Sequence, residues 1–204
     1  MKNLRKTFLL IFAIIALCVC FVFSASALEE SGKLGDNVTY TYNSETKEVV
    51  ISGEGDMWDF IPHSGTNNPP FWGEPEAVEK VVIEDGVTGI GNETFVICEK
   101  LTEITIPDSI TKIGKNAFAG CTLLKNITLP DSITSIGETA FNNCTSIESI
   151  TIPKNITTIN YGTFFCCESI KSIIMPDGVE VIDEKAFYYC ESLEEITIPD
   201  SVTS

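Results

Sequence analysis

The chain has 204 residues, of which 44% are hydrophobic and 21% are charged, and its formal net charge is −16. This length is sufficient for one domain with a hydrophobic core of its own. An acidic surface of this kind repels nucleic acid and anionic membranes. The charge therefore excludes nucleic-acid binding as a function.

The first predicted element is a signal peptide over residues 1–27. Three basic residues precede an apolar run from Thr7 to Phe23, and the segment ends in an A-x-A pattern at Ala27. This combination is typical of a secretory signal with cleavage after Ala27. It predicts a secreted or cell-surface protein that is not inserted in the membrane after cleavage. A retained membrane anchor is the alternative reading of the apolar run.

Residues 28–80 are predicted to form an N-terminal β cap. The stretches VTYTY and EVVIS are typical of two strands that NSETK joins as a hairpin, and HSGTNNPPFWG is typical of a loop. The aromatic residues of this segment are expected to seal the end of the structure that follows, because terminal repeats need a cap. A sugar- or peptide-binding surface is the alternative. These residues are Trp58, Phe60, Phe71 and Trp72.

Residues 81–204 consist of a 23-residue repeat, with five full copies, a partial sixth and no C-terminal cap. A repeat of this period predicts stacked structural units. A stack that ends without a cap is expected to be a fragment of a longer protein. The full copies are Val81–Glu103, Ile104–Asn126, Ile127–Ser149, Ile150–Ser172 and Ile173–Glu195.

Each copy predicts a strand, a tight corner and one helical turn. In the third copy, Ile127-Thr128-Leu129 alternates apolar and polar residues, and Pro130 ends the strand. Ala140, Phe141, Cys144 and Ile147 have the spacing of one helical face. Such a unit cannot bury a core alone, so the fold class is predicted as α/β, a solenoid of stacked strand–corner–short-helix coils. The corner is expected to take a left-handed backbone at Gly91, Gly114, Gly137, Asn160 and Asp183.

Phenylalanine and cysteine each recur once per copy and are predicted to form ladders in the core. Equivalent positions on stacked coils lie about 4.8 Å apart. Their parallel side chains do not converge to the roughly 3.5–4.5 Å between Cβ atoms that a disulfide needs, so free, buried thiols are expected. Cys166 lies outside this pattern and is expected to be partly buried and without a chemical role. A reactive thiol is the alternative. The ladders are Phe95, Phe118, Phe141, Phe164 and Phe187, with Cys98, Cys121, Cys144, Cys167 and Cys190.

The repeat resembles the BspA-like leucine-rich repeat family of bacterial surface proteins. The segment GDNVTYTYNSETKEVVISGEGDM is similar to the N-terminal cap of some members, although Leu34 stands where a cysteine is common. The resemblance implies a leucine-rich-repeat solenoid and adhesion to extracellular-matrix proteins or to other cells. In the second copy it is carried by Ile104-x-Ile106-Pro107, Ile110, Ile113-Gly114, Ala117-Phe118, Cys121 and Leu124.

The sequence lacks the residue patterns of a catalytic or cofactor site. The one histidine is His63, and no Gly-rich phosphate loop, G-x-S-x-G elbow or CxxC motif is present. No enzymatic activity and no cofactor are therefore expected. A row of aspartates could offer oxygen ligands to calcium, but Asp after Pro suits a tight turn, which is the preferred interpretation. This row is Asp85, Asp108, Asp131, Asp177 and Asp200.

Outward positions of the repeat supply two candidate partner surfaces. The fourth and fifth copies carry aromatic residues where earlier copies carry small or polar ones, and clustered exposed aromatics are typical of contact patches. Local packing over the predicted helical turn, or against a missing sixth coil, is the alternative. The other candidate is the outward face of the predicted strands. The residues are Tyr161, Phe165, Tyr188 and Tyr189 for the first surface, and Thr105, Thr128, Thr151 and Ile174 for the second.

The predicted function is an adhesin-like binding module with an extracellular protein or glycan partner, for example one of the host matrix. A structural spacer that displays a missing C-terminal domain, with or without enzymatic activity, is the alternative. The two hypotheses differ in whether the chain itself binds a partner.

Overall fold

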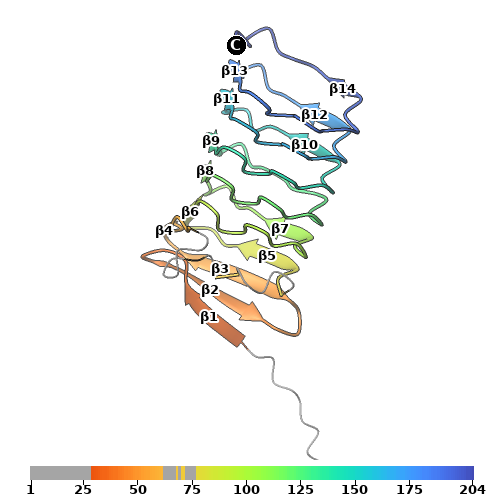
Figure 1. The fold of residues 1–204 in the computed structure, drawn as a ribbon. Coiled ribbons are helices and arrows are strands. Elements are labelled where there is room, and N and C mark those ends of the chain that lie inside the picture. Colours follow the sequence, from red (N-terminus) through yellow and green to blue (C-terminus); the bar gives the residue numbers. More distant parts are fainter. Residues whose placement is uncertain (1–28, 62–67, 69, 72–76) are drawn as a thin grey trace, which may run out of the picture.

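The computed structural model describes residues 29–61, 68, 70–71 and 77–204 of the chain. The predicted signal peptide, His63 and Trp72 lie outside the described residues. The described chain forms a stack of coils that continues in one direction from a small N-terminal sheet (Figure 1). It contains strands and turns but no helix.

The N-terminal sheet runs directly into the first coils. Strands β1 (Glu29–Lys33), β2 (Val38–Asn43) and β3 (Glu48–Gly53) pair antiparallel. Next, β3 pairs parallel with β5 (Lys80–Ile83), and β5 pairs parallel with β7 (Glu103–Thr105). The strands β2 and β3 cover the two stretches that the sequence predicted as strands, whereas β1 was not predicted. One continuous sheet therefore joins residues 29–53 to the repeats.

Each strand of the repeats pairs with the equivalent strand of a neighbouring copy. Ile150 lies opposite Ile173, and Thr158 lies opposite Val181, so equivalent residues of neighbouring coils lie side by side in parallel strands. The coils contain up to two strands each. The first strands form two of the sheets and the second strands form the other two. The sequence did not predict the second strands. The remaining strands are β4 (Gly55–Asp56), β6 (Val87–Ile90), β8 (Lys112–Ile113), β9 (Ser135–Ile136), β10 (Ser149–Thr151), β11 (Thr158–Ile159), β12 (Ser172–Ile174), β13 (Val181–Ile182) and β14 (Glu195–Ile196).

The predicted strand at Ile127-Thr128-Leu129 is wrong. These residues form no strand, and the first-strand sheet is interrupted between β7 and β10. The side chains of Ile127 and Leu129 are nevertheless buried, at 8% exposure each. An alternation of apolar and polar residues indicates which side chains are buried. A side chain can be buried although its backbone forms no strand-to-strand hydrogen bonds.

The predicted helical turn is also wrong, although its inward face is correct. Ala140, Phe141, Cys144 and Ile147 are fully buried. The backbone N–H groups of this segment instead alternate between tight turns and the next coil. For example, Cys144 donates to the Phe141 carbonyl at 3.2 Å, whereas Phe141 donates to the Thr163 carbonyl at 2.9 Å. Bonds between coils thus replace the i→i−4 bonds that define a helix.

The left-handed backbone positions lie later in each coil than predicted. Positive φ occurs at Glu93, Asn116, Thr139, Gly162 and Lys185, and again at Ile97, Gly120, Asn143, Cys166 and Tyr189. Glycine at the predicted corner has a different cause. A Cβ atom on Gly114 or Gly137 would lie 2.5 Å from a backbone nitrogen of the preceding coil. These glycines are therefore required by the close approach of two backbones.

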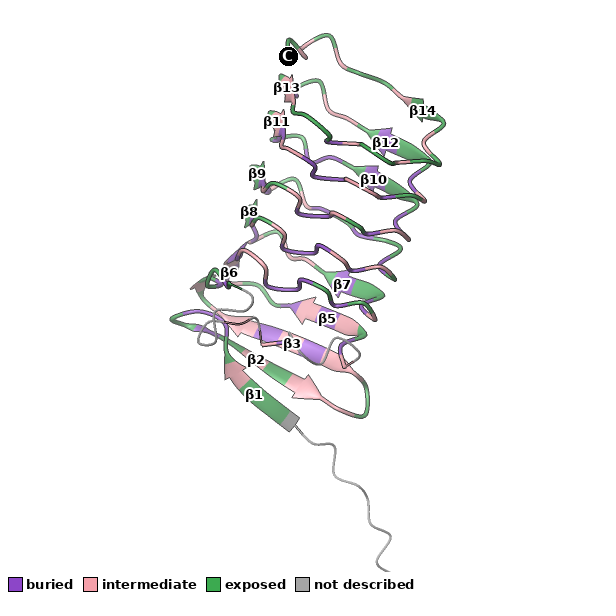
Figure 2. Cartoon of the chain, in the orientation of Figure 1, coloured by how far each residue is buried: buried purple, intermediate pink, exposed green. Residues whose placement is uncertain are grey.

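The core includes the two predicted ladders beside many buried Ile, Val and Leu side chains. Neighbouring phenylalanine rings from Phe95 to Phe187 stack with centroids 5.3–5.7 Å apart, and Phe71 extends the stack at 5.8 Å from Phe95. The ladder cysteines are free, and all but the half-buried Cys190 are buried. Each ladder thiol from Cys121 onward donates to a carbonyl of the preceding coil, such as Cys144 Sγ to the Phe118 carbonyl at 3.1 Å. Buried residues recur in this way in coil after coil (Figure 2).

Candidate functional site

The fourth and fifth coils bring three of the predicted aromatic residues into one cluster. Phe165 and Tyr188 are stacked, with centroids 5.5 Å apart. The Tyr189 ring is nearly perpendicular to both, at 4.4 Å from Tyr188 and 6.1 Å from Phe165. Tyr188 and Tyr189 are 49% and 53% exposed. We call Phe165, Tyr188 and Tyr189 the aromatic cluster.

The repeat geometry explains why the cluster forms. Phe165 and Tyr188 occupy equivalent positions on adjacent coils, and Cys166 N–H donates to the Tyr188 carbonyl at 2.9 Å. The following residues, Cys166 and Tyr189, have φ of 57° and 58°. The chain therefore turns at the same place in both coils, which sets the two aromatic side chains side by side. In earlier coils the same positions hold Ala119 and Asn142.

Tyr161 forms a separate contact instead of joining the cluster. Lys185 Nζ donates to the Tyr161 hydroxyl at 3.2 Å and lies 5.5 Å from the centroid of its ring. This hydrogen bond raises the pKa of Lys185. The ammonium group is therefore held in its charged form beside the hydroxyl of an aromatic ring.

The electrostatic surroundings of the aromatic cluster are negative. Glu168 and Glu191 are both exposed and follow the ladder cysteines of the fourth and fifth coils. The pKa of Tyr189 is raised, mainly by a hydrogen bond with Tyr188 and less by Glu191. Burial, followed by Glu168 and Glu191, raises the pKa of the half-buried Cys166 thiol. A raised pKa lowers the thiolate fraction of Cys166 and with it the reactivity of this thiol.

The predicted strand-face surface is exposed but not continuous. Thr105 lies on β7, Thr151 on β10 and Ile174 on β12, whereas Thr128 lies in the interruption between the sheets. Ile174 is the most exposed large apolar side chain of the described chain, at 64%. A recess between residues 126–129 and β10 separates the row further. This row therefore does not form one flat sheet face.

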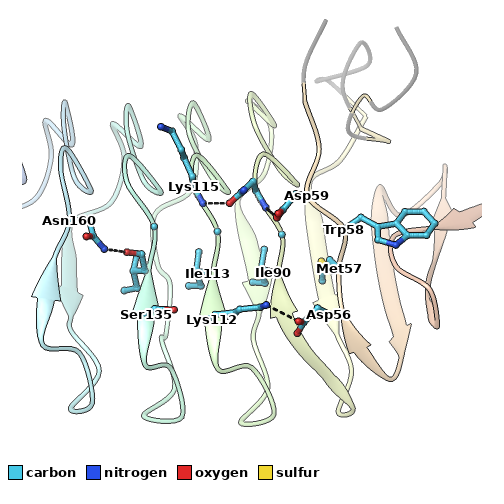
Figure 3. Close-up of a pocket in the computed structure, with 15 residues that line it drawn as sticks. Asp56, Met57, Trp58, Asp59, Ile90, Lys112, Ile113, Lys115, Ser135 and Asn160 are labelled. Atoms are coloured by element: carbon cyan, nitrogen blue, oxygen red, sulfur yellow. Dashed lines mark hydrogen bonds and ion pairs between the residues drawn. The ribbon is translucent and has the colours of Figure 1, made fainter. Parts of the chain in front are cut away.

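A groove that the sequence did not predict runs along β4, β6, β8 and β9 (Figure 3). It encloses about 590 Å³, and its floor includes the closely approaching glycines. Its polar groups are engaged between coils: Lys112 pairs with Asp56 at 2.7 Å, and Asn92 Oδ1 accepts from Lys115 N–H at 2.7 Å. The recurring glycines Gly91, Gly114 and Gly137 line the groove, but their pattern was interpreted as a corner.

The described aromatic residues of the N-terminal cap and one residue of the aspartate row make contacts within the fold. Phe60 and Phe71 are buried, at 6% and 7% exposure, and Trp58 Nε1 donates to Asp36 at 3.1 Å. In the aspartate row, Asp131 pairs with Lys154 at 2.9 Å, which lowers the pKa of this carboxyl. The described residues contain no group of three or more His, Cys, Asp or Glu side chains that could hold a metal ion. They also contain no helix with the length and hydropathy required to span a bilayer.

Comparison with known proteins gives one family and several structural relatives. The model of the BspA type leucine rich repeat region matches residues 76–204 in six copies. No curated protein sequence matches the chain. A leucine-rich repeat protein from Eubacterium ventriosum aligns with a TM-score of 0.73 and 24% identity, over 85% of this chain and 45% of that one.

Two further structures are similar at slightly higher identity. A leucine rich cell surface protein from Faecalibacterium prausnitzii has a TM-score of 0.63 and 28% identity, over 85% of this chain and 50% of that one. A leucine-rich repeat protein from Bacteroides ovatus has a TM-score of 0.54 and 29% identity, over 82% and 53%. The chain thus spans about half the length of these three relatives.

Proposed function

Because the chain belongs to the BspA-type leucine-rich repeat family, we propose that it is a secreted or cell-surface, adhesin-like module that binds an extracellular protein or glycan. The module holds its partner on the outer surface of the repeats and performs no chemistry on it. The predicted signal peptide supports the location, as does the similarity to a relative described as a cell surface protein.

The aromatic cluster is the observation that supports the binding role most strongly. A fold that needs only its inward residues leaves the outward ones free to vary, so unusual outward residues indicate a partner surface. Tyr188 and Tyr189 are half-exposed, and tyrosine is enriched among the residues that dominate binding energy. The groove and the strand-face row are weaker candidates, because polar groups of the groove are already paired and the row is interrupted.

A binding screen with a matched variant tests the proposal. The purified chain is tested against matrix proteins, mucins and a glycan array, beside the double variant Tyr188→Ser/Tyr189→Ser. Ile174→Ser is the control, since it removes an even more exposed apolar side chain from the other candidate surface. We expect the double variant to lose roughly thirtyfold in affinity, as for the loss of a binding hot spot, and the control to bind normally.

Two results would contradict the proposal. If the folded chain bound no partner, the spacer hypothesis would replace the binding module. If the double variant bound as well as the parent chain while Ile174→Ser lost binding, the partner surface would lie on the strands. Circular dichroism spectra of all three proteins exclude unfolding as the cause of any loss.

A further inference from the structure

We propose that the aromatic cluster selects a cationic partner segment, rich in arginine or lysine. This inference rests on the proposed binding function and names the partner class for the same surface. It follows from the charge of the coil that carries the cluster, from the chemistry of the exposed rings and from a contact that the chain already makes with one of its own cations.

The coil that carries Tyr188 and Tyr189 is the most acidic of the repeat. The fifth copy has seven Asp or Glu residues and one Lys, whereas the second copy has one Asp and three Lys. In the fifth copy the acidic residues Glu184, Glu191, Glu194 and Glu195 are all exposed. Two residues of the aromatic cluster therefore belong to the copy with the largest negative charge, and Glu191 lies close enough to Tyr189 to act on it electrostatically, so this charge attracts a positively charged segment.

The rings of the cluster offer faces in more than one direction. The planes of Tyr188 and Tyr189 differ by 72°, and those of Phe165 and Tyr189 differ by 83°. The face of an aromatic ring is the negative part of its quadrupole and attracts ammonium and guanidinium groups. Carboxylates next to exposed aromatic faces thus form a surface that suits a cation better than a neutral or anionic group.

The chain itself places a cation next to one of its tyrosine rings. Lys185, the one basic residue of the fifth copy, lies beside the Tyr161 ring with Nζ 5.5 Å from its centroid. Its Nζ also donates to the Tyr161 hydroxyl. The exposed rings of Tyr188 and Tyr189 have no such cation from the described chain over them. A cation of the partner can therefore make the contact that Lys185 makes with Tyr161.

Binding of short peptides to the purified chain tests the inference. The probes are three peptides of alternating glycine and one other residue, which is Arg, Gln or Glu, measured by calorimetry at low and at physiological salt. We expect the Arg peptide to bind at least tenfold more tightly than the Gln peptide, the Glu peptide not to bind, and added salt to weaken the Arg peptide.

Two double variants and a control double variant separate the effect of the local surface from that of the overall charge. Glu168→Gln/Glu191→Gln removes carboxylates beside the cluster, and Tyr188→Ser/Tyr189→Ser removes the rings. Glu99→Gln/Glu103→Gln is the matched control, because it removes two exposed carboxylates from the first copy, where no such cluster lies. We expect each of the first two variants to weaken the Arg peptide about tenfold and the control to leave it unchanged.

The inference is overturned if the Gln peptide binds as tightly as the Arg peptide, or if the first-copy control loses as much affinity as the variant beside the cluster. A neutral glycan that binds the parent chain and not Tyr188→Ser/Tyr189→Ser would keep the proposed function but refute the cationic partner. A chain that binds no partner in the screen refutes the proposed function on its own account.

Discussion

At the scale of the residue, two positions in every coil take a left-handed backbone, although they are often not glycine. Ile97 has φ of 59°, whereas the equivalent residues in the next two coils are Gly120 and Asn143. A β-branched residue is strained in this region, and asparagine is more readily accommodated. Ile97 is also 42% exposed, so its replacement removes little core packing.

We therefore predict that Ile97→Asn stabilises the chain by about 1 kcal/mol. The change is measured as an increase in the urea midpoint with an unchanged slope. Leu123→Asn is the control, since Leu123 is similarly exposed, at 40%, and does not have positive φ. An equal or lower midpoint for Ile97→Asn than for Leu123→Asn would show that the strain at residue 97 is negligible.

The thiols lead to a prediction about pH. Burial raises the pKa of Cys98 and of Cys144 to about 12. Below that pKa the thiolate fraction falls about tenfold for each pH unit, and the thiolate is the reactive form. In the native chain at pH 8, we expect an alkylating reagent to modify the half-buried Cys166 first. Peptide mass spectrometry after timed quenching measures the order, and equal rates for Cys144 and Cys166 would contradict it.

At the scale of the element, the sequence predicted which side chains face inward better than which backbone groups pair. Phe141 and Cys144 are inward as their spacing required, but the same spacing suited tight turns as well as a helix. The second strand of each coil was not predicted because it is as short as the two residues Lys112–Ile113. The predicted strand at residues 127–129 failed because pairing depends on the distance to neighbouring coils, which no local pattern contains.

The interruption of the first-strand sheet has a measurable consequence. Within the described chain, no backbone hydrogen bond has its donor at Asn126, Ile127, Thr128 or Leu129. In contrast, β10 and β12 pair through Ser149–Thr151 and Ser172–Ile174. Amides without such bonds exchange with solvent at low opening free energies.

We therefore expect the amides of residues 126–129 to exchange at least tenfold faster than those of β12. Hydrogen exchange followed by NMR resolves the individual amides. The flanking residue Leu124, whose N–H donates to Cys121 at 3.2 Å, is the internal control for slow exchange in the same coil. Protection of Thr128 equal to that of β12 would show that the sheet is continuous through the third copy.

The aromatic cluster was predicted from the sequence because equivalent positions of the repeat can be compared. Aligning the copies showed that Phe165, Tyr188 and Tyr189 depart from their equivalents, so their position on one face followed from the period. Tyr161 was grouped with them because sequence alone does not contain its contact with Lys185. The groove was not predicted, because it is formed by backbones that approach one another at Gly114 and Gly137.

At the scale of the whole molecule, stability is approximately a sum over neighbouring coils. The phenylalanine stack shows this most directly. Phe118 is fully buried between Phe95 and Phe141, with both centroids at 5.3 Å. Phe187 is partly buried and stacks on Phe164 alone among the described residues, at 5.7 Å. The first ring therefore loses contacts on two sides when it is truncated, and the second loses them on one.

We predict that Phe118→Ala destabilises the chain by about 3–5 kcal/mol, the usual cost of truncating a buried phenylalanine, and Phe187→Ala by about half as much. Urea unfolding followed by circular dichroism measures both losses. Hydrogen exchange provides the second test, because Phe187→Ala should raise exchange only in the last coils, whereas Phe118→Ala should raise it in the coils on both sides of residue 118. Equal losses with uniform exchange would mean that the coils unfold as one cooperative unit, because the loss at one interface would then be shared by every coil.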